Sequence, residues 1–357
     1  MSTQRANVEQ TRSVSYAGTV RVEWEAAAGM NDSDEILAVK AAELYYQAGK
    51  TQDEIGLALS VSRWKVGRLL VQARDRGFVR FEIVHPSARK FGLEREICER
   101  FGLLESVVVP TLETDSDIQS RVAQAAADYL TMMRPVPRTL GVSWGRTLQA
   151  VAARLRTGWA VGVNTVQVNG SVSSTRLASA AADTATLIAR KAEGRATMLP
   201  SPAIFEQPAT RRAIESDRSV HSVLELARNA NAFLFSAGPV DASSVHVDSG
   251  YLTTADVDRL AAQGAVGDVL GRFITEDGEV ADQDLNDRTL GLTLDDLRGA
   301  ERSIAVIAGE AKQKVTNAVV SSGLCTTLIT DEASANYLVR AHEEGPRMAM
   351  ASNEGER

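Results

Sequence analysis

Cysteine, histidine and long apolar runs are scarce in this sequence of 357 residues. The two cysteines, Cys98 and Cys325, form no C-x-x-C pair, so the sequence indicates neither a disulfide framework nor a cysteine zinc site. The four histidines are scattered, without the spacing of metal ligands. No apolar run reaches the roughly 18–20 residues that cross a bilayer, and the polar N-terminal stretch lacks the apolar core of a secretory signal. We therefore expect a cytoplasmic protein with no cofactor, no metal and no membrane partner.

The formal net charge is −7, but this charge is unevenly distributed. Residues 62–80 hold six basic residues and one acidic residue, a net +5, so the rest of the chain carries −12. An acidic chain is unsuited to coating nucleic acid non-specifically, yet a compact basic segment favours one element that faces phosphates. A solvated helix face is the alternative explanation of the same charges.

Periodicity and composition divide the chain into five segments. They are a disordered arm at 1–32, a helix-turn-helix domain at 33–86, a linker helix at 87–103, an α/β domain at 104–342 and a disordered polar tail at 343–357. The helical domain is expected to begin with a helix at 33–50 and to end with a strand at 78–84, which His85-Pro86 stops.

Apolar runs alternate with alanine-rich helical stretches from about residue 104 onward. The predicted strands are Ser106–Pro110, Thr139–Ser143, Thr165–Asn169, Phe233–Ala237, Ser303–Ala308 and Thr326–Thr330. The predicted helices include 117–133, 145–156, 174–193 and 310–321. This alternation predicts an α/β fold with a mainly parallel sheet covered on both faces.

Residues 51–76 have the features of a helix-turn-helix. Thr51 and Glu54 stand three residues apart, which is the spacing of a capping box at a helix start. Ser60-Val61 is expected to form the turn, and Ser62 can cap the second helix. The apolar face of the first helix would consist of Ile55, Ala58 and Leu59, and that of the second of Val66, Leu69, Leu70 and Ala73.

The second helix has an outward face that could read DNA in the major groove. Arg68 could contact guanine with two hydrogen bonds, worth roughly 1–3 kcal/mol of discrimination. Arg63 and Lys65 could hold phosphates, and Gly67 could permit a close approach to the sugar-phosphate backbone. The candidate DNA-contacting residues are Thr51, Gln52, Ser62, Arg63, Trp64, Lys65 and Arg68.

Several blocks of the sequence resemble one family in order. The first is Tyr-Tyr-x-x-Gly-x-Thr-Gln-x-Glu-Ile-x-x-x-Leu-x-Val-Ser-Arg at 45–63, continued by Val-x-Arg-Leu-Leu-x-x-Ala-Arg-x-x-Gly-x-Val at 66–79. Later blocks are Gly-Val-Ser-Trp-Gly-Arg-Thr-Leu at 141–148, Val-Asn-Gly at 168–170, Gly-Ala-Val-Gly-Asp-Val-Leu-Gly-Arg-Phe at 264–273, Lys312, and Leu-Ile-Thr-Asp-Glu at 328–332. Over residues 35–340 the chain resembles the SorC-type sugar-responsive transcription regulators of bacteria.

This resemblance implies a DNA-binding domain joined to a Rossmann-like effector domain, related in fold to glucosamine-6-phosphate deaminase and sugar-phosphate isomerases. It also implies a sugar, polyol or sugar-phosphate effector, double-stranded operator DNA as partner, and a homo-oligomer, either dimer or tetramer. The chain departs from the family pattern at Gly67, where the family usually has serine. It also departs at Ala308-Gly309-Glu310 and at Ile274-Thr275, which leaves the identity of the effector open.

The effector site is expected at the loop from Ser143 to Thr147, between a strand and a helix. Backbone N–H groups at such a helix start, with nearby hydroxyls and Arg146, can hold an anion or a polyol oxygen. In an open α/β sheet, ligands bind at the carboxyl ends of the strands. The candidate effector-binding residues are Ser143, Gly145, Arg146, Thr147, Asn169, Gly170, Ser171, Asp268 and Lys312.

Three functions compete on this evidence. The leading hypothesis is a ligand-controlled transcription regulator with no catalytic residues. The second is an enzyme of the sugar-phosphate isomerase or deaminase class with an appended DNA-binding domain. Such an enzyme needs a base over the sugar, and no histidine falls in the loops named above, which leaves Asp268 and Glu310 as candidates. The third, an architectural DNA binder, would leave the whole α/β domain unexplained.

Overall fold

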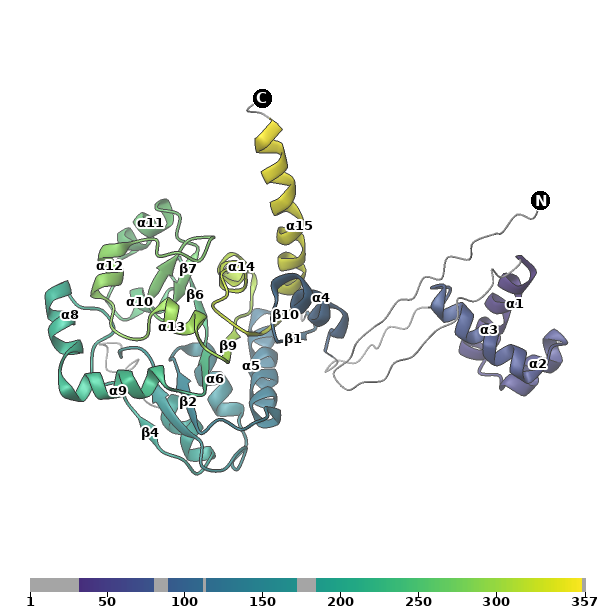
Figure 1. Cartoon of the computed structure of the whole chain (residues 1–357), viewed down its shortest axis with the longest axis horizontal. Coiled ribbons are helices and arrows are strands. Elements are labelled where there is room, and N and C mark those ends of the chain that lie inside the picture. Colours follow the sequence, from purple (N-terminus) through teal and green to yellow (C-terminus); the bar gives the residue numbers. More distant parts are fainter. Residues whose placement is uncertain (1–31, 80–88, 112–113, 172–183, 355–357) are drawn as a thin grey trace, which may run out of the picture. The chain divides into compact units, whose positions relative to one another are not determined.

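The computed structural model describes residues 32–79, 89–111, 114–171 and 184–354. The chain forms two compact units, Met1–Val84 and His85–Arg357, which are described separately (Figure 1). The domain boundary predicted at residues 86 and 87 lies two residues away. The predicted arm at 1–32 lies outside the described residues except for its last residue. Most of the predicted strand at 78–84 and the first half of the predicted helix at 174–193 also lie outside them.

The first unit is a small helical domain. Its elements are helix α1 (Asp32–Ala42), the π-helical turn η1 (Glu43–Gln47), α2 (Gln52–Leu59) and α3 (Arg63–Asp75). The predicted helix at 33–50 is therefore divided between α1 and η1. The buried core contains Ala38, Ala41, Ile55, Val66, Leu69, Leu70 and Ala73. Ala58, predicted to face inward, is exposed, because the buried side of α2 runs through Ile55 and Gly56 instead.

The turn between α2 and α3 depends on a close backbone approach. Ser60 takes a left-handed conformation with φ 53°, and the Val61 N–H donates to the Gly56 carbonyl oxygen at 2.9 Å. A Cβ at Gly56 would stand 2.8 Å from the Val61 carbonyl oxygen, so a side chain there would force the turn to move. The predicted caps are present: Thr51 and Glu54 form a capping box, and the Ser62 side chain accepts from the Lys65 N–H.

The second unit is built on a seven-stranded parallel sheet in the order β1-β10-β9-β5-β2-β3-β4. The strands are β1 (Glu105–Val109), β2 (Thr139–Val142), β3 (Asn164–Gln167), β4 (Ala196–Thr197), β5 (Ala232–Phe235), β9 (Ser303–Val306) and β10 (Thr327–Asp331). All six predicted strands are confirmed within about two residues, and the two-residue β4 was not predicted.

Both faces of this sheet are buried, as predicted. Val107 and Val109 of β1 point into one core and Val108 into the other, and the same alternation recurs along the neighbouring strands. One face is covered by α5 (Asp115–Met132), α6 (Arg146–Arg154) and a helical segment at 184–191. The opposite face is covered by α4 (Phe91–Phe101), α9 (Arg218–Arg228), α13 (Leu294–Arg298), α14 (Gln313–Ser321) and α15 (Glu332–Glu354).

Two predictions at the ends of this domain need correction, although the helix expected within 87–103 is present. The helix predicted as a linker is α4, which is part of the second unit. The apolar face of α4 packs beside β1 and α15, so Ile97 is fully buried in the core on that side of the sheet. The predicted disordered tail from residue 343 instead continues α15 to Glu354 (Figure 1). Arg100 of α4 binds Glu343, and Phe101 packs edge-on against His342, so contacts with α4 support this helix where the tail was predicted to begin.

A second, antiparallel sheet follows β5 and was not predicted. It consists of β6 (Ala237–Pro239), β7 (Gly267–Val269) and β8 (Arg272–Ile274), in that order. The remaining helical elements are α8 (Pro208–Glu215), α10 (Val245–Asp248), α11 (Thr254–Ala262), α12 (Gln283–Arg288) and the 3₁₀ turn η2 (Glu310–Lys312). No helix of the described residues is long and apolar enough to span a membrane.

Candidate functional site

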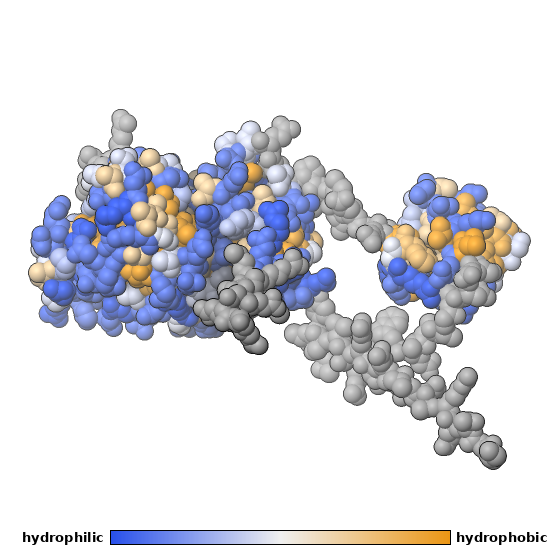
Figure 2. Space-filling model, turned by 90° about the horizontal axis from the view of Figure 1, so that it is seen from above, coloured by the Kyte–Doolittle hydropathy of each residue, from blue (hydrophilic) through white to orange (hydrophobic). Residues whose placement is uncertain are grey.

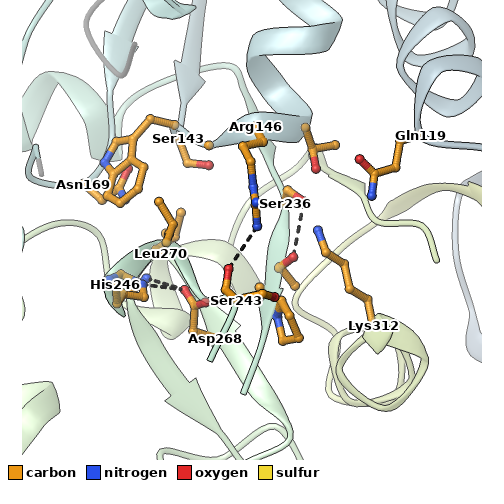
Figure 3. A pocket seen from close by; sticks show the side chains of 18 residues that line it. Gln119, Ser143, Arg146, Asn169, Ser236, Ser243, His246, Asp268, Leu270 and Lys312 are labelled. Carbon is orange, nitrogen blue, oxygen red and sulfur yellow. Dashed lines mark hydrogen bonds and ion pairs between the residues drawn. The ribbon is translucent and has the colours of Figure 1, made fainter. Parts of the chain in front are cut away.

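A cavity of about 330 Å³ opens at the carboxyl ends of the central strands of the second unit (Figure 3). The order in which successive strands are added to the sheet reverses at β2, since β3 lies on one side of it and β5 on the other. Such a switch point leaves a crevice outside the strand ends in an open parallel sheet. Ser143 follows β2, Ser236 follows β5 and Asn169 lies just beyond β3, so all three strand ends reach the cavity.

The loop after β2 leads into the uncapped start of α6. Gly145 has φ 137°, a conformation that L side chains rarely adopt, and no side chain of the described residues caps this helix. The first N–H groups of a helix lack partners within the helix and attract negative charge. Gly145, Arg146 and Thr147 all line the cavity, so this corner can bind an anion.

Two cationic side chains line the cavity. Arg146 Nη2 donates to the Ser243 carbonyl oxygen at 3.0 Å. Lys312, the last residue of η2, is half-buried, and its side-chain amine makes no hydrogen bond or ion pair within the described part of the chain. Burial lowers the pKa of Lys312 to about 8, with Arg146 contributing, although Asp268 favours the charged form. Both groups are therefore available to an anionic ligand near neutral pH.

A buried histidine–aspartate pair lies on the side of the cavity formed by α10 and the small sheet. His246 Nε2 lies 3.2 Å from Asp268 Oδ2, and the same oxygen accepts the Gly271 N–H at 3.0 Å. Burial opposes ionisation of Asp268, but His246, the Gly271 N–H and Lys312 together hold the pKa of its carboxyl below the usual value. Asp268 is thus a carboxylate at neutral pH.

Asn169 supplies a buried acceptor. Its Oδ1 atom has no hydrogen-bond partner among the described residues, although Asn169 is only 3% exposed and lines the cavity. A buried polar atom without a partner is costly unless water or a ligand satisfies it. Its neighbours serve the scaffold: the Gly170 carbonyl oxygen accepts Trp144 Nε1 at 2.7 Å, and the Ser171 carbonyl oxygen accepts the Tyr251 hydroxyl at 2.8 Å.

The structure brings together seven of the nine predicted effector residues. Those that line the cavity are Ser143, Gly145, Arg146, Thr147, Asn169, Asp268 and Lys312; Gly170 and Ser171 do not line it. Sequence reasoning missed His246, Ser236, Ser243 and Gln119, which also line it. His246 had been set aside because it lies in none of the recognised loops. No sequence signal links it to Asp268, since their contact depends on the unpredicted antiparallel sheet.

In the first unit, six of the seven predicted DNA-contacting residues line one groove along α3. The groove is lined by Gln52, Ser62, Arg63, Trp64, Lys65, Gly67, Arg68 and Val71. Arg63 and Arg68 are exposed, and Trp64 is 89% exposed, which is unusual for so large an apolar side chain. Figure 2 shows apolar and hydrophilic residues side by side on the surface of this unit.

Several of the predicted contacts already have partners within the unit. Lys65 Nζ lies 2.9 Å from Asp34 Oδ1 of α1, and both side chains are about one-third exposed. The Thr51 hydroxyl is engaged by the capping box, donating to Glu54 Oε2 at 2.9 Å. Arg63 lies 3.5 Å from Asp53, but this pair is solvent-exposed and weak.

Comparison with known proteins agrees with this arrangement. The profile of the Sugar-bind family, described as "Putative sugar-binding domain", matches residues 85–340. The chain is 32% identical over 311 residues to the deoxyribonucleoside regulator of Bacillus subtilis (strain 168), covering 87% of this chain and 99% of that protein. This chain belongs to the SorC-type family of sugar-responsive transcription regulators.

Solved structures of the family have the same fold. A domain of a possible sugar-binding transcriptional regulator from Arthrobacter aurescens TC1 is 31% identical, with TM-score 0.62, covering 72% of this chain and all of that one. The full-length sorbitol operon regulator SorC from Klebsiella pneumoniae is 24% identical, with TM-score 0.63, covering 86% of this chain and all of that one. The relatives are transcription regulators, and this family member is therefore a regulator and not an isomerase or deaminase.

Proposed function

We propose that this regulator binds operator DNA through α3 and that a phosphorylated sugar or polyol in the cavity controls the binding. The observation that carries the proposal is the cavity itself. It joins the uncapped start of α6 and two cations, Arg146 and Lys312, to the hydrogen-bonding groups of Asp268 and Asn169. The start of α6 and the two cations suit a phosphate, and Asp268 and Asn169 suit the hydroxyls of a sugar.

The regulated genes would belong to carbohydrate or polyol metabolism. The Bacillus subtilis relative is a deoxyribonucleoside regulator and the Klebsiella pneumoniae relative a sorbitol operon regulator. Both names describe small hydroxylated metabolites, and the polar lining of the present cavity suits that class of ligand.

We also propose a Rossmann-like fold for the effector domain. Counted from β2, the strand order β4-β3-β2-β5-β9-β10 is 3-2-1-4-5-6, the order of a doubly wound nucleotide-binding sheet, with β1 added at one edge. The kinship with sugar-phosphate isomerases is what the family resemblance implies, and a cavity at the switch point is compatible with it.

Control of DNA binding would act through assembly. Helix-turn-helix proteins read DNA as pairs whose recognition helices are set one helical turn apart. An effector that favours one packing of paired effector domains would change this spacing by shifting the population of states. We therefore propose a homo-oligomer, a dimer or tetramer, as the functional form.

A thermal-shift screen of sugars, polyols and their phosphates tests the effector site. A ligand at about 100 times its Kd should stabilise the protein by about 2.7 kcal/mol. Arg146→Ala and Lys312→Ala should abolish the shift while leaving affinity for operator DNA intact. A ligand that stabilises both variants as much as the wild type would place the effector elsewhere.

Gel-shift titration of operator fragments tests the reading helix. Arg68→Ala should weaken specific binding by roughly 1–3 kcal/mol and relax the preference at one base pair. Unchanged affinity and specificity in this variant would show that the exposed face of α3 is not the reading face.

A further inference from the structure

The charges of the cavity are arranged asymmetrically. Of its eighteen lining residues, three carry a formal charge at neutral pH with histidine neutral: Arg146, Lys312 and Asp268. In Figure 3 His246 and Asp268 lie on one side and Lys312 on the other, with Arg146 pointing between them. No further cation lines the cavity within the described residues, so a second anionic group beside Asp268 would have to share Arg146 and Lys312 with the first.

His246 fixes the position of this carboxylate. A carboxylate only accepts hydrogen bonds, so the Nε2 atom of His246 donates to Asp268 Oδ2. The imidazole is itself held between two rings, with Trp144 at 6.1 Å and Phe273 at 5.8 Å between centroids. Nε2 of His246 and the Gly271 N–H both donate hydrogen bonds to Oδ2 of Asp268, while Oδ1 receives no hydrogen bond from the described residues. His246 therefore acts as a positioning residue that leaves one oxygen of Asp268 free for a ligand.

We propose that the His246–Asp268 pair makes this cavity selective for an effector with a single phosphate. The free Oδ1 atom accepts a hydroxyl hydrogen at the end of the effector remote from its phosphate. A second phosphate at that end meets a fixed carboxylate and finds no cation of its own, because Arg146 and Lys312 already serve the first phosphate. Like charges brought together in a desolvated site are strongly unfavourable. The inference rests on the proposed function, because it assumes that sugar phosphates enter this cavity.

The test compares matched pairs of ligands on the full-length protein by calorimetric titration. The probes are fructose 6-phosphate against fructose 1,6-bisphosphate and ribose 5-phosphate against ribose 1,5-bisphosphate. In the wild type, at least one monophosphate is expected to bind about 100-fold more tightly than its bisphosphate. Asp268→Asn keeps the shape of the side chain and removes its charge. The selectivity ratio, which is the affinity for the monophosphate divided by that for the bisphosphate, should therefore fall at least about tenfold, mainly because the bisphosphate binds better.

Two variants of His246 separate positioning from simple structural support. His246→Gln keeps an N–H donor of similar reach, so it should retain most of the wild-type ratio. His246→Leu removes the donor and frees Asp268 to turn, so the ratio should narrow. A purely structural role would weaken both ligands equally and leave the ratio unchanged, which would overturn the positioning role. The unliganded melting temperature of each variant shows whether it is folded.

The possible outcomes distinguish this inference from the function on which it rests. If a monophosphate and its bisphosphate bind the wild type equally well, the cavity is not selective and the inference fails, while the proposed binding of phosphorylated ligands is supported. If Asp268→Asn leaves a wild-type preference unchanged, Asp268 is not its cause and the inference fails again. If none of the four probes binds and the thermal-shift screen finds no other phosphorylated ligand, the phosphate site is at fault and both proposals fall; a phosphorylated ligand found by the screen would replace the probes in the same comparison.

Discussion

A Cβ at Gly238 would stand 2.2 Å from Oδ1 of Asp268, the carboxylate oxygen that the proposed effector meets. Gly238 of β6 pairs with Asp268 of β7 across the small antiparallel sheet, so the missing side chain makes the space in which the carboxylate sits. The need for glycine here is steric, because the position shows no unusual φ.

Gly238→Ala should therefore displace the Asp268 side chain. The hydrogen bonds from His246 and from the Gly271 N–H would be strained or lost, and overpacking of this kind typically costs about 1–3 kcal/mol of stability. We expect effector affinity to fall at least about tenfold in thermal-shift titration, with little change in DNA binding without effector. Gly92→Ala is the matched control, since nothing lies within 4 Å of a Cβ there. Equal effector affinity in Gly238→Ala and the wild type would contradict this account.

Effector binding should depend on pH through Lys312. Its pKa is lowered to about 8, chiefly by burial, so the amine is protonated below this value and increasingly neutral above it. A bound phosphate favours the protonated form, so affinity should be highest below about pH 8. Above that it should fall, by up to about tenfold per pH unit, until the pKa of the bound state is passed. Calorimetric titrations between about pH 7 and pH 9 would measure this slope.

Lys312→Met provides the control for this pH dependence. Arginine stays charged throughout the range, so Arg146 contributes no slope of its own. The variant should bind phosphorylated ligands weakly and with a flat profile. The same slope in the variant and the wild type would assign the titration to another group.

The architecture was predictable where burial imposes a simple pattern. Strands such as β2 and β9 are buried on both faces, and they appear in the sequence as apolar runs between helices. The three-residue strands β6 and β7 contain glycine, proline or aspartate and show no alternation, so they were not recognised. His246 was missed with them, since it meets Asp268 only when α10 packs beside that sheet.

The linker helix shows a second limit of sequence reasoning. The segment around Ile97 has an amphipathic pattern that predicts a helix. The pattern does not show which part of the protein the apolar face packs against. Glu94 makes the attachment specific, because its buried carboxylate accepts the Val108 N–H of β1 at 2.9 Å and hydrogen bonds from Nε and Nη2 of Arg89. Such contacts between distant residues leave no local sequence signal.

Asp34→Asn should strengthen operator binding. The carboxylate of Asp34 holds Lys65 at 2.9 Å, and its removal both frees the ammonium for phosphate and takes away a negative charge beside α3. We expect several-fold tighter binding at low salt. If Lys65 then contacts a phosphate, the dependence of log affinity on log salt should steepen by about one.

Glu43→Gln is the charge-matched control for that change. Glu43 lies in η1 and makes no ion pair with the described residues, so the substitution changes net charge equally without freeing a lysine. An identical gain in both variants would reduce the effect to long-range electrostatics, and the proposed competition for Lys65 would be wrong.

Gly67→Ala should stabilise the helix-turn-helix without harming DNA binding. The nearest atom to a Cβ at this position is Gln52 Oε1 at 3.5 Å, an ordinary van der Waals contact, and glycine inside a helix is less favourable than alanine by about 1 kcal/mol. Slower hydrogen exchange of the α3 amides in the full-length protein would report the gain. Gly56→Ala should act in the opposite direction, since its Cβ would press on the Val61 carbonyl oxygen at 2.8 Å. A loss of operator affinity above about tenfold in Gly67→Ala, despite slower exchange, would instead mean that the bare backbone at Gly67 approaches the DNA.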